Sequence, residues 1–475
     1  MKPDHPSSPG ISTEIAIKIF ALATISLAVT ACATAGDIEE VEPSFELPEN
    51  WHQERVHGET LEEDWCANFG DPGLEGIIEE VLVENLDLRI AQARLDESRA
   101  LLSQSRSRRH PQVSIGAEAE FERGPDGFSQ DYEIPLRATY ELDLWGRLRS
   151  EISADQRDYL AEEADLTALR ILLAAQTAEQ YYELARTRAT IDLIEEQMEI
   201  ANTFLELTKV RRAQGMASAI DVIQQQQRID QLRELHRAAQ LDKTLAYNGM
   251  ASLLGRPPGE VEVVAARRLP ETLPPVADFL PADLLERRPD IWAARTRVIA
   301  ADHRVDAALA ERLPQLQISA TLSAQSNNLR ELFDYLFVTG VGSLLQPIWD
   351  GGRRSARVAE EEAQREQSLL EFSATLLDAI REVEDTLARG QALYEILLMQ
   401  RVQLDLAQDA LELAKVQYRA GVLDYLRVLT AMESVQALES AELDSRRALL
   451  SQRIHLCRVA GGFWPSDGDE SEEDR

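Results

Sequence analysis

Two long parts of the chain carry hydrophobic residues at the spacing of an α-helix. In the first, apolar positions recur at intervals of three and four residues, which is the helix period. They are Leu160, Ala164, Leu166, Leu169, Leu173, Ala175 and Tyr182. No proline lies between Pro135 and Pro257 or between Pro347 and Pro465, and both windows are rich in helix formers. A helix over about 150–212 would be roughly 90 Å long, so its apolar stripe must be buried in a coiled-coil or barrel-like bundle.

Four shorter segments carry the two-residue period of a β-strand, at about 112–122, 132–145, 315–325 and 336–349. In the first, the apolar positions are Val113, Ile115, Ala117, Ala119 and Phe121, and polar or acidic residues and one glycine alternate with them. The fourth segment alternates poorly. Strands of about ten residues with one apolar face are typical of membrane β-barrels, although a sheet half-buried on a soluble protein has the same pattern.

Four strands in one chain leave two open edges, which hydrocarbon does not tolerate. The chain is therefore expected to oligomerise. A trimer would close a twelve-stranded barrel, and the strand arithmetic alone also permits other numbers of copies.

The chain contains an internal duplication. Pro111-Gln112-Val113-Ser114-Ile115 returns as Pro314-Gln315-Leu316-Gln317-Ile318, 203 residues later. Two further motifs return at an offset near 206, in the same order. We therefore expect a first repeat at 61–255, a proline-rich linker at 256–289 and a second repeat at 290–465.

Charge and composition narrow the function. There are 83 acidic and 49 basic residues, a net charge of −34, which argues against binding to nucleic acid or docking on anionic lipid through a basic face. Three cysteines are too few for a disulfide framework. The end of the chain, 466–475, is predicted to be a solvated acidic tail.

The N-terminus is predicted to be a signal peptide over residues 1–31. Thirteen uncharged residues precede Cys32, too few for a mature membrane span but enough for a signal sequence. The run Leu27-Ala28-Val29-Thr30-Ala31-Cys32 resembles a bacterial lipobox, which implies that Cys32 is acylated, that Ala33 after it permits sorting to the outer membrane, and that 32–60 forms a tether. The alternative is a free cysteine after an ordinary signal peptide.

Catalysis is not expected. The seven histidines show no metal-type spacing, and no nucleophile elbow or nucleotide-binding loop is present. The sequence therefore predicts no enzyme activity, no cofactor and no metal site. A structural periplasmic coiled coil or an envelope-spanning adaptor would also contain long helices, but neither explains the alternating strands.

Several motifs together resemble the outer membrane efflux proteins, closest to the TolC-like lipoproteins of NodT type that serve resistance-nodulation-division pumps. They are Phe69-Gly70-Asp71-Pro72-Gly73-Leu74 after Trp65, Asn85-Leu86-Asp87-Leu88, Tyr140-Glu141-Leu142-Asp143-Leu144-Trp145-Gly146-Arg147, Leu285-Glu286-Arg287-Arg288-Pro289-Asp290-Ile291 and Pro347-Ile348-Trp349-Asp350-Gly351-Gly352-Arg353. The resemblance implies a mainly α-helical homotrimer, with four strands per chain in a twelve-stranded outer-membrane barrel continued by a periplasmic helical tunnel. Such a duct passively conducts substrates from an inner-membrane pump through a periplasmic adaptor. A type I protein secretion duct is the alternative.

The resemblance also assigns site residues at the turns between the long helices, where the adaptor docks and the tunnel closes. The docking residues would be Arg212, Gly215, Arg419 and Gly421. The gate would contain Asp221, but Arg427 and Thr430 stand where the family commonly has acids, with Asp424 nearer the turn. We therefore hypothesise that Arg427 pairs with Asp221 or Asp424 and that Tyr418 packs against the neighbouring helix pair. An exposed, unpaired Arg427 is the alternative.

Overall fold

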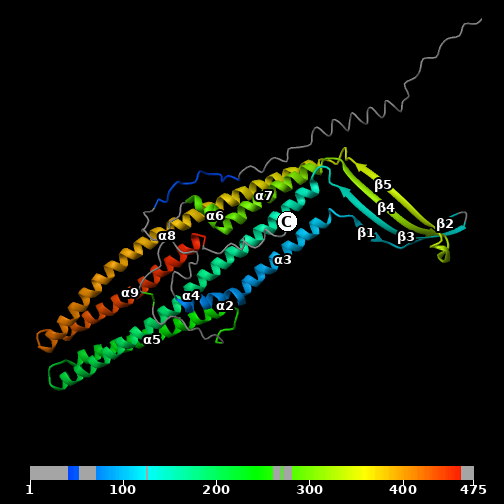
Figure 1. Cartoon of the computed structure of the whole chain (residues 1–475). Coiled ribbons are helices and arrows are strands. Elements are labelled where there is room, and N and C mark those ends of the chain that lie inside the picture. Colours follow the sequence, from blue (N-terminus) through cyan, green and yellow to red (C-terminus); the bar gives the residue numbers. More distant parts are fainter. Residues whose placement is uncertain (1–40, 53–70, 125–126, 260–268, 271–280, 462–475) are drawn as a thin grey trace, which may run out of the picture. The chain divides into compact units, whose positions relative to one another are not determined.

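The structure is a computed structural model that describes residues 41–52, 71–124, 127–259, 269–270 and 281–461 (Figure 1). The predicted signal peptide, Cys32, and the acidic tail lie outside the described residues. The chain divides into two compact units, which are taken separately below. The first contains Ser103–Ala154 and Ile299–Arg365, and the second contains Pro43–Leu102, Asp155–Val298 and Glu366–Arg475.

The first unit is built around one antiparallel sheet. Its strands are β1 (Gln112–Ile115), β2 (Glu118–Gly124), β3 (Gly127–Leu142), β4 (Gln315–Ser326) and β5 (Leu336–Leu345). β3 pairs with β1 and β2 on one side and with β4 on the other, and β4 pairs with β5. β1 and β2 therefore share one edge of the sheet, and β5 forms the other.

The predicted strand 112–122 is interrupted, but its register is continuous. Ile115 pairs with Leu136 and Glu118 with Glu133, so the same alignment holds on both sides of the gap. Between them the Gly116 amide donates to the Pro135 carbonyl at 2.9 Å. Pro135 has no N–H to return that bond, because its nitrogen lies within the ring. β1 and β2 thus act as one strand of a four-stranded sheet, with one ladder bond missing.

The predicted ends of the other strands need small corrections. β3 begins at Gly127 and ends at Leu142, earlier at both ends than the expected 132–145. β5 ends at Leu345, not at 349, because its partner strand β4 begins at Gln315, after Pro314. Pro347 also cannot donate to a ladder. The expected 315–325 matches β4 to within one residue.

The helices show the duplication in their lengths. α4 (Arg147–Ala213) and α8 (Arg353–Arg419) each contain 67 residues, and α5 (Ala219–Leu253) and α9 (Tyr425–Val459) each contain 35. Every one of these boundaries repeats at an offset of 206. α3 (Leu86–Ser107) and α7 (Pro289–Ala310) repeat at 203, with 22 residues each. Shorter helical segments are α2 (Pro72–Glu84), α6 (Leu284–Arg287), η2 (Pro281–Asp283) and η3 (Leu329–Glu331).

In the second unit the long helices form two hairpins (Figure 1). α4 returns as α5 through a short turn, and α8 returns as α9. The first hairpin buries an apolar seam that includes Leu205 of α4 and Leu232 of α5. The larger core lies where α2 joins the hairpins, with Leu74, Tyr182 and Ile454 among its buried members. None of the helices in the described part of the chain is both long and apolar enough to cross a membrane.

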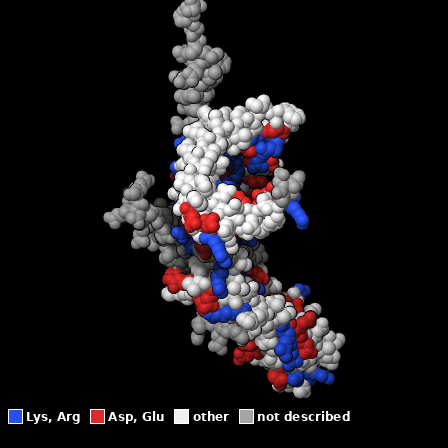
Figure 2. Space-filling view, turned by 90° about the vertical axis from the view of Figure 1, so that its right-hand side faces the viewer, with Lys and Arg blue, Asp and Glu red and all other residues white. Residues whose placement is uncertain are grey.

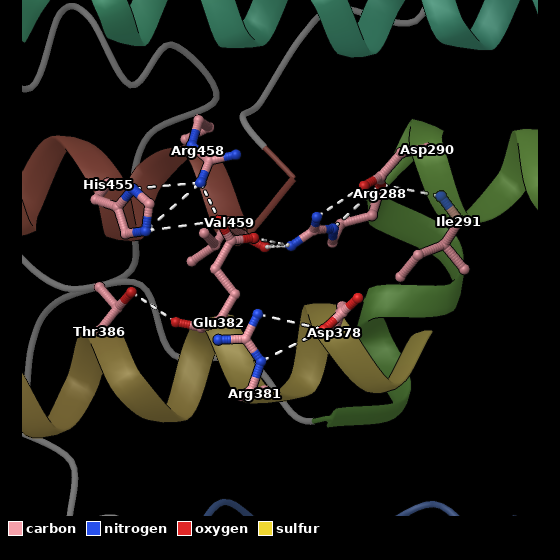
Figure 3. Close-up of polar contacts among 10 residues, drawn as sticks. All are labelled: Arg288, Asp290, Ile291, Asp378, Arg381, Glu382, Thr386, His455, Arg458 and Val459. Atoms are coloured by element: carbon pink, nitrogen blue, oxygen red, sulfur yellow. Dashed lines mark hydrogen bonds and ion pairs between the residues drawn. The ribbon is translucent and has the colours of Figure 1, made fainter. Parts of the chain in front are cut away.

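A polar residue before α3 and before α7 ties each repeat together. Asn85 donates from its side chain to the Leu253 carbonyl at the end of α5, at 2.8 Å. The equivalent Arg288 donates to the Val459 carbonyl at the end of α9, at 3.3 Å, and also binds Asp290 and Glu382 (Figure 3). Glu382 also binds Arg458. The second repeat therefore uses a charged network where the first uses one amide.

Candidate functional site: the sheet and the helical tips

The register gives the sheet two chemically different faces, because residues paired across strands point to the same side. One face, called here the apolar face, contains Val113, Ile115, Tyr132, Ile134, Leu136, Ala138, Tyr140, Leu142, Ile318, Leu322 and Val338. The other, called the polar face, contains Glu118, Glu120, Asp131, Glu133, Arg137, Thr139, Glu141, Gln317, Ser319 and Thr321. Figure 2 shows a curved wall with an uncharged outer surface and charged side chains gathered in its hollow.

The apolar face is uncovered in the single chain. Val338 is 81% exposed and Ile115 is 73% exposed. At the hairpin end of the sheet, the Phe121 ring lies 6.2 Å from Phe128 and 6.0 Å from Tyr132. An apolar surface of this extent marks contact with a membrane or another protein.

β5 departs from the pattern of the other strands. Its register places Phe337 opposite Ser323 and Val341 opposite Ser319, so both apolar side chains lie on the polar face. β5 therefore carries apolar side chains on both faces of the sheet, and this explains its poor alternation in the sequence. Within the described residues, neither β5 nor the β1–β2 edge has an outer partner strand.

Both turns between long helices end the first helix in the same way. Gly215 and Gly421 each have a φ of +75°, a conformation that favours glycine. Met216 donates to the Arg211 carbonyl and Val422 to the Gln417 carbonyl, which is the bond of a Schellman motif. Two of the predicted docking residues are thus explained by local backbone geometry, and the others, Arg212 and Arg419, are exposed beside them.

The start of the returning helix differs between the repeats. In α5 the Ser218 hydroxyl caps Asp221, whose carboxylate accepts from the Ser218 amide at 2.7 Å, which completes a capping box. In α9 the equivalent cap is Asp424, which accepts from the Arg427 amide at 3.1 Å. Arg427 stands at the position of Asp221 and cannot accept a hydrogen bond. Along the described chain, the Arg427 side chain forms no ion pair, so neither hypothesised partner binds it within one copy.

Tyr418 lies between the two hairpins near their tips. Its side chain is buried, and the Arg211 guanidinium of the first hairpin lies 4.2 Å from the ring centre, within cation–π distance. Arg211 also donates to the Tyr418 carbonyl at 3.1 Å. The structure thus places Tyr418 against the other hairpin of the same chain, and its role in closing the tip stays a prediction.

A second tyrosine strengthens the same contact. Tyr425 packs edge-on against Tyr418, with ring centres 5.9 Å apart, and its hydroxyl donates to the Gln225 side chain of the first hairpin. Burial raises the pKa of Tyr425 far above its ordinary value, so it stays a neutral donor. Gln225 also donates from its side chain to the Ala201 carbonyl of α4, so the hydrogen bonds connect Tyr425 with both helices of the first hairpin. The sequence reasoning missed Arg211, Gln225 and Tyr425.

These missed residues had a signal in the sequence, but only in the comparison of the repeats. Position by position, Tyr425 corresponds to Ala219 and Gln225 to Ala431. Where one repeat has a large polar residue near the tip and the other repeat has alanine at the equivalent position, the side-chain contact can form in one repeat only. No group of acidic, histidine or cysteine side chains able to hold a metal was found in the described ranges.

Most of the chain resembles known proteins. The family model described as "outer membrane efflux protein" matches residues 77–256 and again 280–462, one match per repeat. The toluene efflux pump outer membrane protein TtgC of Pseudomonas putida is 30% identical, covering 93% of this chain and 95% of TtgC. The probable outer membrane lipoprotein SilC of Salmonella typhimurium is 26% identical, over 94% and 99%.

Solved structures agree with these relatives. The outer-membrane channel OprN matches with a TM-score of 0.82 and 26% identity, covering 89% of this chain and 99% of OprN. A CusC structure concerned with transmembrane channel formation matches with a TM-score of 0.81 and 26% identity, over 91% and 100%.

Proposed function

This chain belongs to the outer membrane efflux protein family and is the outer-membrane channel of an efflux system, and from this premise we propose how it works. Three copies form a homotrimer whose sheets close a twelve-stranded barrel. The channel passively conducts substrates that an inner-membrane pump delivers through a periplasmic adaptor. We propose neither a cofactor nor a catalytic role for it, because the family is one of transport ducts.

The observation that carries the proposal is the sheet, open at both edges and apolar on one face only. From Tyr132 to Leu142 the apolar face extends over eleven residues, and the ten rises between them, of about 3.3 Å each, give about 33 Å along the strand. A strand tilt of about 40° reduces this to about 25 Å, the height of the apolar band of an outer-membrane barrel. The polar face would then line a water-filled duct, with Glu118, Glu120 and Glu141 favouring cations over anions.

The open edges require neighbouring copies, because unpaired backbone groups are costly in hydrocarbon. β5 of one copy would pair with the β1–β2 edge of the next. A lipid anchor on Cys32 would hold the trimer in the outer membrane. The relative SilC is likewise described as a probable outer membrane lipoprotein.

The tips would form both the docking surface and the gate. Arg212 and Arg419 are exposed beside the glycine turns and would contact the adaptor together with the backbone at Gly215 and Gly421. Because the Arg427 side chain forms no ion pair with any described residue of its own chain, we assign its partner to Asp221 of the adjacent copy. Such a pair at the exposed tip would bias the gate toward closure only weakly.

Recording single-channel currents from the purified trimer in planar bilayers tests the function. Wild-type protein should form heat-modifiable oligomers and steady pores. Arg427→Glu should raise the conductance, because it places a second carboxylate beside Asp221. Arg381→Glu, an equal charge change on the exposed surface of α8, is the control and should leave it unchanged. Absence of pores in wild-type protein would contradict the channel, and unchanged conductance in Arg427→Glu would contradict the gate.

A further inference from the structure

The strand β5 carries an apolar stripe on the polar face of the sheet. Its side chains on that face are Phe337, Thr339, Val341, Ser343 and Leu345. Phe337, Val341 and Leu345, called here the β5 stripe, are 51%, 50% and 64% exposed. Together they extend for about 26 Å along the strand. Among the described residues of β1 to β4, the same face carries one apolar side chain, Pro135.

Contact with the membrane does not account for the β5 stripe. The residues of β5 on the apolar face are Leu336, Val338, Gly340, Gly342 and Leu344. A side chain added at either glycine would meet no atom within 4 Å, so the apolar face has room for apolar side chains that β5 does not place there. A slip of one residue would only exchange the two sides, and each side carries three large apolar side chains. In either register, three of them face away from the lipid.

Other side chains do not cover the β5 stripe. Its neighbours on β4 are polar, namely Ser323, Ser319 and Gln315. Across the open edge, the adjacent copy of the proposed trimer would add further polar residues of β1, namely Gln112 and Ser114. A twelve-stranded barrel is wider than the barrels of about eight strands whose interior side chains fill. The stripe therefore remains in contact with the solutes that occupy the duct.

Carboxylates lie beyond the Phe337 end of the β5 stripe. Phe337 is level with Pro135 of β3, through Ser323 of β4. The next two levels toward the hairpins pair acidic residues directly across β2 and β3, Glu118 with Glu133 and Glu120 with Asp131. Levels on one face are about 6.6 Å apart. Like charges placed opposite each other destabilise a sheet, so a cation near these levels would offset their repulsion.

One basic side chain opposes these acids. Within the described strands, Arg137 is the only Lys or Arg on the polar face, and it lies one level beyond Pro135 on the side away from the hairpins. It is level with Thr339, two strands away on β5. The acidic residues outnumber it, and the proposed trimer repeats this surplus in each copy. The field at the Phe337 end of the stripe is therefore negative.

From this arrangement we infer that the β5 stripe is a binding site for apolar organic cations in the barrel wall. The stripe removes apolar surface of such a solute from water, and the face of the Phe337 ring attracts positive charge. The carboxylates of the neighbouring levels attract the same charge. This inference rests on the proposed trimeric channel, and it makes the barrel wall selective where a passive duct needs only to be wide and wet.

Protection of an introduced cysteine provides the first test. Thr339→Cys lies between Phe337 and Val341 on the same face, and Thr139→Cys is the matched control on β3, two strands from Val341. Each is treated with a cationic methanethiosulfonate in the purified trimer, and the labelled peptide is measured by mass spectrometry. Benzyltriethylammonium should slow labelling of Thr339→Cys at least twofold more than labelling of Thr139→Cys. Tetraethylammonium, which has the same charge without the ring, should protect neither position.

Removing the β5 stripe provides the second test. With Phe337→Ser, Val341→Ser and Leu345→Ser together, the same protection should need about tenfold more benzyltriethylammonium, and with Phe337→Ser alone about threefold more. Phe333→Ser, the same change at a residue that is 70% exposed in the β4–β5 connection, is the matched control and should leave protection unchanged. All three stripe positions are exposed in the single chain, and normal pore currents of each variant without the cation show that its barrel has formed.

The charge of the ligand is tested separately. Benzenesulfonate, an aromatic anion, should protect Thr339→Cys less than benzyltriethylammonium does. Glu118→Gln with Glu133→Gln should weaken protection by the cation about threefold at low salt, and this difference should shrink at high salt.

Equal protection of Thr339→Cys and Thr139→Cys, or unchanged protection after removal of the stripe, would overturn the inference. Equal protection by the anion and the cation would refute the assigned class of ligand. Any of these results with normal wild-type pores leaves the channel function standing, whereas wild-type protein without pores contradicts the proposed function itself.

Discussion

Replacing Arg288 by alanine should destabilise the second unit by about 3 kcal/mol. The Arg288 side chain is 10% exposed. It donates to Asp290 at 2.7 Å, to Glu382 at 3.0 Å and to the Val459 carbonyl at 3.3 Å (Figure 3). It thereby connects the start of α7 with α8 and with the end of α9.

The magnitude follows from what each partner keeps after the change. Removing one member of a buried ion pair costs about 3–5 kcal/mol when the other is left without a partner. Here Glu382 retains Arg458, and Asp290 retains a backbone bond from Ile291 and is 37% exposed. The Val459 carbonyl loses one donor. These remaining contacts and the partial exposure place the expected cost at the lower end of the range, about 3 kcal/mol.

Thermal and urea unfolding of the full chain in detergent, followed by circular dichroism, measures the loss. Arg381→Ala is the matched control. Arg381 is adjacent to Glu382 in sequence but is 65% exposed, and among the described residues it pairs only with Asp378 and Asp385. It should cost less than about 0.5 kcal/mol. If Arg288→Ala were no more destabilising than Arg381→Ala, the network would not hold the helix ends together and the reasoning would be refuted.

Three further predictions concern the sheet, pH and the anchor. Ile318→Arg, on the apolar face of β4, should cost about 2–4 kcal/mol and deplete heat-modifiable trimer from outer membranes, whereas Ser319→Arg, on the polar face, should be tolerated; equal effects would contradict the assignment of the faces. Burial lowers the pKa of His455, beside Arg458 and Glu382, so the folded protein binds its proton more weakly than the unfolded chain and stability should fall as the pH drops below about 6.5. In His455→Asn the melting temperature should change less with pH in that range. A pH profile identical to wild type would assign the loss of stability to other groups. Cys32→Ser should abolish incorporation of labelled palmitate, while retained labelling would exclude Cys32 as the acylated residue.

Much of the architecture could be predicted from the sequence, because its causes are local or repeated. The proline-free windows predicted the long helices, and α4 begins only three residues before the expected position. Alternation assigned the two faces of three strands, and the motifs identified the family, which the comparisons confirm. The interruption opposite Pro135 was not predicted, because it depends on which residue of a neighbouring strand the proline meets.

The candidate site was less predictable. The resemblance assigned Asp221 to a gate, and Asp424 was hypothesised as a partner of Arg427. The structure shows that Asp221 completes the capping box of α5 and that Asp424 is the N-cap of α9. The Arg211 contact with Tyr418 joins residues 207 positions apart, and no period along one helix indicates such a contact. Whether such residues pair depends on the direction of their side chains at the tip. A sequence pattern predicts only the face of the helix on which each residue lies.

The equal lengths of the hairpins restrict how this protein can change in evolution. Deleting one residue from α4 alone would shift its tip by about 1.5 Å along the axis and turn it by about 100°, which separates Arg211 from Tyr418. The other three long helices would keep their lengths, so the six tips of a trimer would no longer meet in one plane. Viable changes in length should therefore come as whole heptads, made in α4, α5, α8 and α9 alike. A single frame-preserving indel in one hairpin is expected to be far more harmful than most substitutions at the same position.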